Sequence, residues 1–201
     1  MKRGRPPGGS PDTSDRILAA AAEEFAGHGL AGARTVRIAR SAGVTHAMLH
    51  YYFRSKDELY RSVLASLGAE FERAMLEAIR GAAAPMDMPA LVVTLFEGLA
   101  ANRAYVRMVL WDLAAGGGQS RTLPLPTLTA LDAGLLQRLP AGVDLRQVLT
   151  TLLGATVIYF FDDPLLERLF EGDRFAANAL SERAEHLRRL ATVMLAAGAP
   201  E

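Results

Sequence analysis

The side chains that usually carry enzymatic chemistry are scarce in this chain and form no recognisable site. The 201 residues include no cysteine, which excludes a cysteine nucleophile and Cys-zinc sites. The four histidines are His28, His46, His50 and His186. Gly116–Gly118 lead into Gln119 rather than the Gly-Lys of a phosphate loop, and a solvated helix end before Pro164 explains the carboxylate pair Asp162-Asp163. We therefore expect neither an enzyme nor a bound cofactor.

His46 and His50 stand four residues apart, a spacing that places both imidazoles on one face of a helix and can bind zinc. No third ligand and no intervening glutamate accompanies them, so we expect no metal. Imidazoles on an exposed helix can instead donate to, or accept from, the edges of DNA bases. That chemistry requires neighbouring elements that hold the helix in the major groove.

Residues 35–53 predict such elements, because two short segments, 35–42 and 45–52, flank Gly43. Apolar side chains of both segments can form a small shared core. They are Ile38, Ala39, Ala42, Val44, Leu49 and Phe53. The pattern is typical of a helix-turn-helix whose second helix enters the major groove, although a generic helical hairpin has the same apolar spacing.

The stretch 14–64 resembles the TetR family of bacterial transcriptional repressors. The matching residues are Ile17, Ala20, Ala21, Phe25, Gly29, Ile38, Ala39, Ala42, Gly43, Val44, Thr45, Leu49, Tyr52, Phe53, Ser55, Lys56 and Leu59. The resemblance implies an all-α fold, with an N-terminal three-helix helix-turn-helix DNA-binding domain and a C-terminal helical ligand-binding and dimerisation domain. It also implies a homodimer that binds a double-stranded DNA operator and responds to a small-molecule effector.

The resemblance places five residues against DNA phosphates. Thr35 and Thr45 begin the two short helices, where free backbone N–H groups attract anions. Tyr51 and Tyr52 match aromatic positions that hold phosphates in the family, and Lys56 matches its phosphate-binding lysine. Core packing is the alternative role for Tyr52.

The resemblance also implies that His46, Ala47 and His50 face base edges. An alanine methyl can meet a thymine methyl, and a histidine can form a hydrogen bond with a base. His50 replaces a tyrosine that is common in the family, and Ala47 replaces a glycine or proline. Val36 stands where a polar residue often reaches the groove, so this chain is expected to read fewer bases from the first short helix.

Residues 1–12 contain three prolines, three glycines and no apolar periodicity, which predicts a flexible basic arm. The segment Lys2–Pro6 contains the Arg-Gly-Arg-Pro core of an AT-hook, so Arg3 and Arg5 could lie in an A·T minor groove. A solubilising tail is the alternative. Residues 1–62 carry ten basic and six acidic side chains, and such a basic end suggests that this part of the chain meets an anion.

Apolar periodicity predicts helices along the rest of the chain and no strand. The first begins at Thr13 or Ser14 and ends near Gly27 to Gly29, and a capping box from Ser55 to Glu58 opens a long helix. Further helices are predicted over 89–115 with a break near Asn102, and over 127–139, 144–161 and 174–197. The predicted parts are an arm over 1–12, a DNA-binding domain over 13–58 and a ligand-binding and dimerisation domain over 59–201.

The C-terminal part offers side chains that could line an apolar effector cavity with a few polar partners. The apolar candidates are Phe71, Met75, Phe96, Tyr105, Met108, Trp111 and Tyr159, and the polar candidates are Asn102, Arg103 and Arg107. Ordinary core packing is the alternative for each of them. The helices over 144–161 and 174–197 match the place of the family's four-helix dimer interface, with an intramolecular core as the alternative.

The longest run without a charged residue, Gln147 to Phe161, has 15 residues and is too short to span a bilayer. No signal peptide opens the chain, so a cytoplasmic protein without a membrane partner is expected. The sequence favours a ligand-responsive transcriptional regulator, a repressor that a small, mostly apolar effector releases from its operator. The alternatives are a non-specific, A·T-rich DNA-associated architectural protein and a helical enzyme with a vestigial helix-turn-helix.

Overall fold

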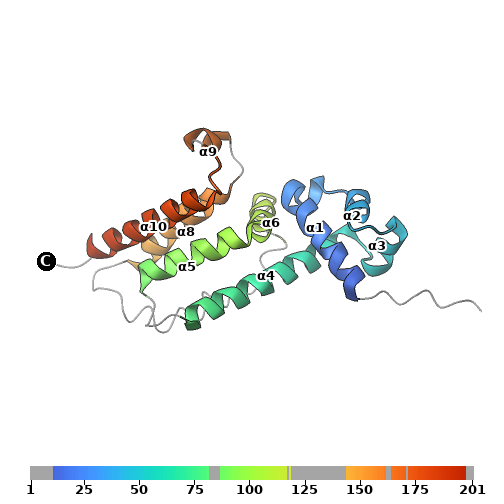
Figure 1. Cartoon of the computed structure of the whole chain (residues 1–201), viewed down its shortest axis with the longest axis horizontal. Helices are drawn as coiled ribbons and strands as arrows, with labels where there is room; N and C mark the ends of the chain where they lie inside the picture. Colours follow the sequence, from blue (N-terminus) through green and yellow to red (C-terminus); the bar gives the residue numbers. More distant parts are fainter. Residues whose placement is uncertain are drawn as a thin grey trace, which may run out of the picture. The chain divides into compact units, whose positions relative to one another are not determined.

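The computed structural model describes residues 11–81, 87–116, 118, 144–161, 164–170 and 172–197, and within these ranges every regular element is a helix. Figure 1 shows their arrangement. The elements are α1 (Pro11–Gly32), α2 (Thr35–Ser41), α3 (His46–Tyr52), α4 (Lys56–Gly81), α5 (Met88–Ala101), α6 (Arg103–Ala114), α8 (Leu145–Val157), the 3-10 helix η3 (Ile158–Phe160), α9 (Pro164–Leu169) and α10 (Ala177–Ala197). The predicted all-α fold is confirmed. Arg3, Arg5 and the predicted helix over 127–139 lie outside the described residues.

The chain divides into two compact units. The first comprises Met1–Gly68 and Arg107–Leu123, and the second comprises Ala69–Val106 and Pro124–Glu201. Both α4 and α6 contribute residues to each unit. The sequence predicted boundaries after residues 12 and 58, whereas the first unit extends to Gly68 and also includes most of α6.

Two glycines shape the first unit because they adopt backbone angles that side chains disfavour. Gly29 has φ 63° and ψ 179° and breaks α1 one turn before its end, close to the predicted stop. Gly43 has φ 66° and turns the chain between α2 and α3, as predicted. The core that forms around these turns contains fully buried Ile17, Phe25, Ile38, Leu49 and Leu59.

The caps predicted at Thr45 and at Ser55 are present, but the one predicted at Thr13 or Ser14 is not, because α1 begins two residues before Thr13, at Pro11. The Thr45 hydroxyl accepts a hydrogen bond from the Met48 N–H at 3.1 Å at the start of α3. The Ser55 hydroxyl accepts from the Glu58 N–H at 3.0 Å, while the Glu58 carboxylate accepts from the Arg54 N–H at 3.0 Å. Each cap satisfies an N–H group that the helix itself leaves open, and such a cap typically stabilises by about 1 kcal/mol.

In the second unit α5 and α10 pack side by side (Figure 1). Ala184, Leu187 and Ala191 of α10 are buried, so the face that the sequence offered for dimerisation lies in the intramolecular core. The predicted helix over 144–161 ends as an α-helix at Val157 and continues as η3. The short helix α9 was not predicted, because Pro164 was interpreted as a breaker, although proline also suits the first position of a helix.

No helix in the described ranges combines the length and apolarity needed to cross a membrane.

Candidate DNA-binding surface

Helix α3 buries one side chain and exposes nearly all the others. Leu49 is 1% exposed and anchors the helix to the core of the first unit. The exposed residues of α3 and its cap are Thr45, His46, Ala47, Met48, His50 and Tyr51. The predicted base readers His46, Ala47 and His50 therefore share a solvent-facing surface, as readout of a groove requires.

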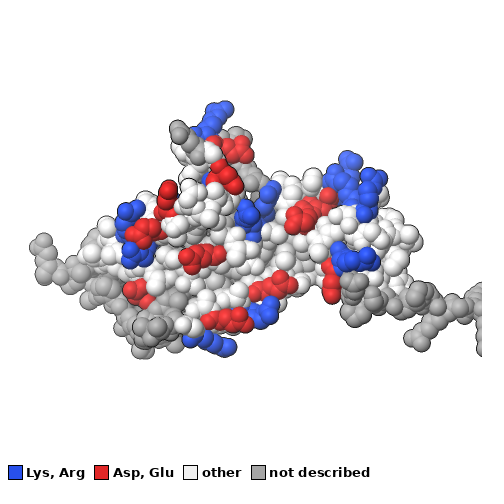
Figure 2. Space-filling view, viewed as in Figure 1, with Lys and Arg blue, Asp and Glu red and all other residues white. Residues whose placement is uncertain are grey.

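The segment from Ala33 to Lys56 carries five basic side chains and no acidic one. They are Arg34, Arg37, Arg40, Arg54 and Lys56. Blue side chains gather over α2 in Figure 2. Among the described residues, the guanidinium groups of Arg34, Arg40 and Arg54 form no ion pair, so all three can face phosphates.

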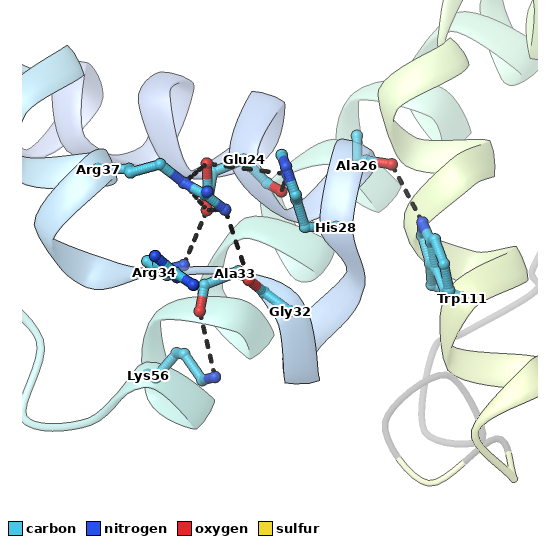
Figure 3. A network of polar contacts seen from close by, with 9 residues as sticks. All are labelled: Glu24, Ala26, His28, Gly32, Ala33, Arg34, Arg37, Lys56 and Trp111. Atoms are coloured by element: carbon cyan, nitrogen blue, oxygen red, sulfur yellow. Dashed lines mark hydrogen bonds and ion pairs between the residues drawn. The ribbon is translucent and has the colours of Figure 1, made fainter.

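Glu24 of α1 holds the start of α2 in place (Figure 3). Its carboxylate accepts hydrogen bonds from Arg37 Nη2 at 2.6 Å and Nε at 2.8 Å, and from the Arg34 N–H at 2.8 Å. Burial raises the pKa of Glu24, but the hydrogen bonds from Arg37 and Arg34 outweigh it and lower that pKa below its ordinary value. Arg37 thus serves the fold by joining α2 to α1.

Lys56 lies at the start of α4 and contacts the end of α1. Its ammonium group donates to the carbonyl of Ala33 at 3.3 Å (Figure 3) and to that of Ala31 at 3.4 Å. A lysine has three N–H donors, so one remains for the phosphate contact predicted from the sequence. The two contacts also give Lys56 a structural role that the sequence did not indicate.

The two threonines predicted to meet phosphates use their hydroxyls differently. Thr45 caps α3, whereas the Thr35 hydroxyl lies 3.0 Å from His46 Nε2 and shares a hydrogen bond with it. The His46 and His50 rings meet edge to face, with centroids 4.4 Å apart and planes at 85°. No group of three or more potential metal ligands occurs in the described part of the chain.

The two adjacent tyrosines face different environments. Tyr51 is 71% exposed, which suits a phosphate contact. Tyr52 is half-buried, and its hydroxyl is inaccessible to solvent and has no hydrogen-bond partner among the described residues. This placement favours core packing, the alternative role considered for Tyr52.

The family described as "Bacterial regulatory proteins, tetR family" matches residues 17–63, the segment that contains α2, α3 and the first turns of α4. Residues 17–63 therefore carry the N-terminal domain of the TetR family. The chain is 37% identical over 101 residues to the HTH-type transcriptional repressor SCO4008 of Streptomyces coelicolor. It is 40% identical over 62 residues to the HTH-type transcriptional repressor NicS of Pseudomonas putida.

The matched segments cover 50% of this chain and 49% of SCO4008, and 31% of this chain and 29% of NicS. The likeness to a solved structure extends further. The putative transcriptional regulator SCO4942 of Streptomyces coelicolor superposes with a TM-score of 0.67 at 27% identity, over 90% of this chain and 97% of that one. All three similar proteins are described as regulators or repressors of transcription.

Three of the predicted effector-contact residues lie in the first unit, together with α2 and α3. The Trp111 indole donates to the carbonyl of Ala26 at 3.2 Å (Figure 3), and its ring packs against Gly29. Met108 is fully buried and its carbonyl accepts from the Tyr60 hydroxyl at 3.0 Å. Arg107 belongs to the same unit. Met108 therefore packs in the core, whereas Trp111 remains 47% exposed while it contacts α1.

The other candidates lie in the second unit. Phe71 and Tyr105 stack with centroids 5.4 Å apart. Met75 packs so close to Gly98 that a Cβ at residue 98 would lie 2.6 Å from its Sδ. In a second group, Phe96 meets Tyr159 edge to face at 5.4 Å.

The two polar candidates of this unit also have partners. Asn102 closes α5 by donating its side-chain N–H to the Gly98 carbonyl at 2.8 Å, and the Arg103 guanidinium lies 5.0 Å from the centroid of the Phe175 ring. The candidates of the second unit thus form two aromatic groups, and Asn102 serves as a helix cap.

Glu24 and Arg37, which join α1 to α2, were not among the residues predicted from the sequence. Glu24 precedes its partner Arg37 by 13 residues, and no periodicity links residues at such a separation. One signal was present in the sequence. Glu23 and Glu24 are two adjacent acidic residues in a stretch of α1 that otherwise contains apolar and small residues.

Proposed function

We propose that the protein is a DNA-binding transcriptional repressor that contacts its operator through α2 and α3. The observation that supports this most strongly is the exposed face of α3, set in a segment of five basic and no acidic residues. Phosphate contacts position such a protein, and base contacts specify the sequence. In this proposal Arg34, Arg40, Arg54 and Tyr51 hold phosphates.

The base readers are on α3. Ala47 offers a methyl for a thymine, and His50 offers ring nitrogens for a base edge. Val36 is 57% exposed at the start of α2 and offers a second apolar contact. Lys56 contributes its remaining N–H to a phosphate.

We propose a homodimer, because apolar side chains stay exposed along α8 and the segment that follows it. Leu153, Ile158 and Phe161 are 37%, 49% and 39% exposed, and Val193 of α10 is 65% exposed. Contiguous exposed apolar patches mark protein contact surfaces, and α8, which carries Leu153, packs against α10, which carries Val193. A two-fold dimer would present two copies of α3 to an operator with two related half-sites.

We further propose that a small, mostly apolar effector binds the second unit and releases the DNA. The aromatic groups around Phe71 and Phe96 and the Arg103 guanidinium supply the chemistry for such a ligand. Release requires that the effector bind more tightly to the DNA-free state than to the DNA-bound state. A repressor of this kind works in the cytoplasm, where the operator is.

A charge reversal tests the DNA surface directly. Arg40→Glu should weaken binding to duplex DNA by more than about tenfold, because it replaces a phosphate partner by a repelling charge. Arg80→Glu on the exposed end of α4 in the second unit is the matched control and should leave binding unchanged. Fluorescence polarisation with labelled duplexes measures both, and equal binding by the two variants would place the DNA elsewhere.

The same assay separates the repressor from a non-specific architectural protein. The repressor binds one duplex far better than others of the same length, whereas an architectural protein binds A·T-rich duplexes alike. Specific binders typically gain a factor of about 10³ or more over non-specific DNA. A thermal-shift screen with apolar molecules, followed by polarisation in their presence, tests release by an effector.

A further inference from the structure

We propose that Thr35 is a positioning residue for operator specificity: it holds the His46 imidazole, and His46 in turn orients His50 as the histidine that reads bases. The proposal rests on the DNA-binding function proposed above. It differs from the role implied by the family resemblance, in which Thr35 contacts a phosphate and His46 reads a base.

The hydroxyl of Thr35 is directed to another side chain rather than to the end of its own helix. The N-cap of α2 is Arg34, which makes no side-chain capping bond. Thr35 Oγ1 lies 3.0 Å from His46 Nε2, a good hydrogen-bond distance. The bond joins the first residue of α2 to the first residue of α3, across the Gly43 turn.

This bond limits what His46 can do at a base. Nε2 is engaged whichever tautomer the imidazole adopts, and a neutral histidine has only two ring nitrogens. Nε2 is also the nitrogen farther from the backbone, and therefore the one with the longer reach into a groove. His46 is left with Nδ1, which lies closer to its own helix.

His50 keeps both ring nitrogens for DNA. Its ring stands at 85° to that of His46 with centroids 4.4 Å apart, so the fixed ring of His46 forms one wall against which His50 rests. His50 is exposed, and among the described residues no hydrogen bond engages it. The contacts therefore run from Thr35 to His46 to His50. The Thr35 hydroxyl affects base readout indirectly, because it fixes the His46 ring, which in turn orients the His50 ring.

The test is a double-mutant cycle on duplexes that carry single base changes in one half-site. His50→Ala first identifies the base pair that His50 reads. Thr35→Val, which keeps the branched shape but lacks the hydroxyl, should reduce discrimination at that pair by about 2- to 10-fold, the ratio that one ordinary hydrogen bond supports. Thr35→Ser should restore it, and Ser41→Ala, at the exposed end of α2, should have no effect.

In a His46→Ala background, Thr35→Val should change nothing further, because Thr35 acts only through His46. If Thr35→Val folds poorly, the His46→Ala variant removes the same Thr35–His46 hydrogen bond through its other partner. Circular dichroism checks that each variant is folded. An equal loss on every duplex, additive with His46→Ala, would identify Thr35 as a phosphate anchor and overturn the proposal. A lower melting temperature with unchanged discrimination would overturn it as well.

These outcomes differ from a failure of the proposed function. If the wild-type protein prefers no duplex, both the function and the role of Thr35 are refuted. If it prefers one duplex and Thr35→Val keeps the full preference at the His50 pair, the repressor function stands and only the role of Thr35 is refuted.

Discussion

Replacing Glu24 by glutamine should loosen the attachment of α1 to α2 and lower the stability of the protein. The Glu24 side chain is only 10% exposed and accepts from Arg37 and from the Arg34 N–H. Hydrogen bonds to a charged group contribute about 1.5–3 kcal/mol. Because Arg37 is 43% exposed, water compensates part of its loss, and we expect a cost of about 1–2 kcal/mol.

The pKa of Glu24 determines how the stability difference between wild type and Glu24→Gln changes with pH. The pKa of Glu24 is lower in the folded protein than its ordinary value of 4.5, so its stabilisation is present above that value and is lost as the pH falls through the lowered folded pKa. Glutamine does not titrate. The difference in stability between wild type and Glu24→Gln should therefore be largest near neutral pH and shrink under acid conditions.

Thermal unfolding followed by circular dichroism measures the effect, with Glu23→Gln as the matched control. Glu23 is the exposed neighbour of Glu24, and among the described residues it has no ion pair. A loss of about 1–2 kcal/mol lowers the melting temperature of a chain of this size by roughly 2–8 °C. Equal melting temperatures for the two variants, or a difference that persists unchanged at acid pH, would refute the reasoning.

Three further predictions concern stability and assembly. Tyr60→Phe removes a buried hydrogen bond to α6 and should cost about 1–2 kcal/mol in urea unfolding at neutral pH. Burial and, to a smaller extent, Asp112 raise the pKa of Tyr60 to about 12. The stabilisation by the Tyr60 hydroxyl is therefore present below pH 10 and is lost as the pH rises toward 12. Gly29→Ala should destabilise by about 1–2 kcal/mol, because φ is 63° and a Cβ would lie 3.1 Å from the indole of α6. Gly27→Ala, which meets nothing within 4 Å, should be neutral or stabilising in the same melting experiment. Leu153→Arg should convert the proposed dimer to a monomer in light scattering, and an unchanged dimer mass would contradict the proposed interface.

The elements that could be predicted from sequence are those with local signals. Thr45 and Ser55 cap helices within three residues of their partners, and Gly43 turns the chain where the pattern breaks. These interactions join residues that are close in the sequence, so local patterns reveal them. The outward placement of His46 and His50 was implied by the family resemblance, and the burial of Leu49 in the predicted small core is consistent with it.

The parts that could not be predicted depend on partners distant in sequence. Trp111 donates to a carbonyl 85 residues earlier, so an aromatic residue that suited an effector cavity instead packs on α1. Lys56 reaches back 23 residues to Ala33, and no local pattern distinguishes this bond from a phosphate contact. The residue type shows which side chains can form hydrogen bonds or pack in a core, and the tertiary fold determines which residues they contact.

The central claim is that α3 reads a specific operator as part of a symmetric dimer. Repeated selection of the purified protein against a pool of randomised duplexes tests it most directly. We predict enrichment of one sequence with two half-sites related by two-fold symmetry, and loss of that enrichment for an Ala47→Glu variant. A pool that stays unenriched, or that gains only A·T content without a defined sequence, would contradict the claim.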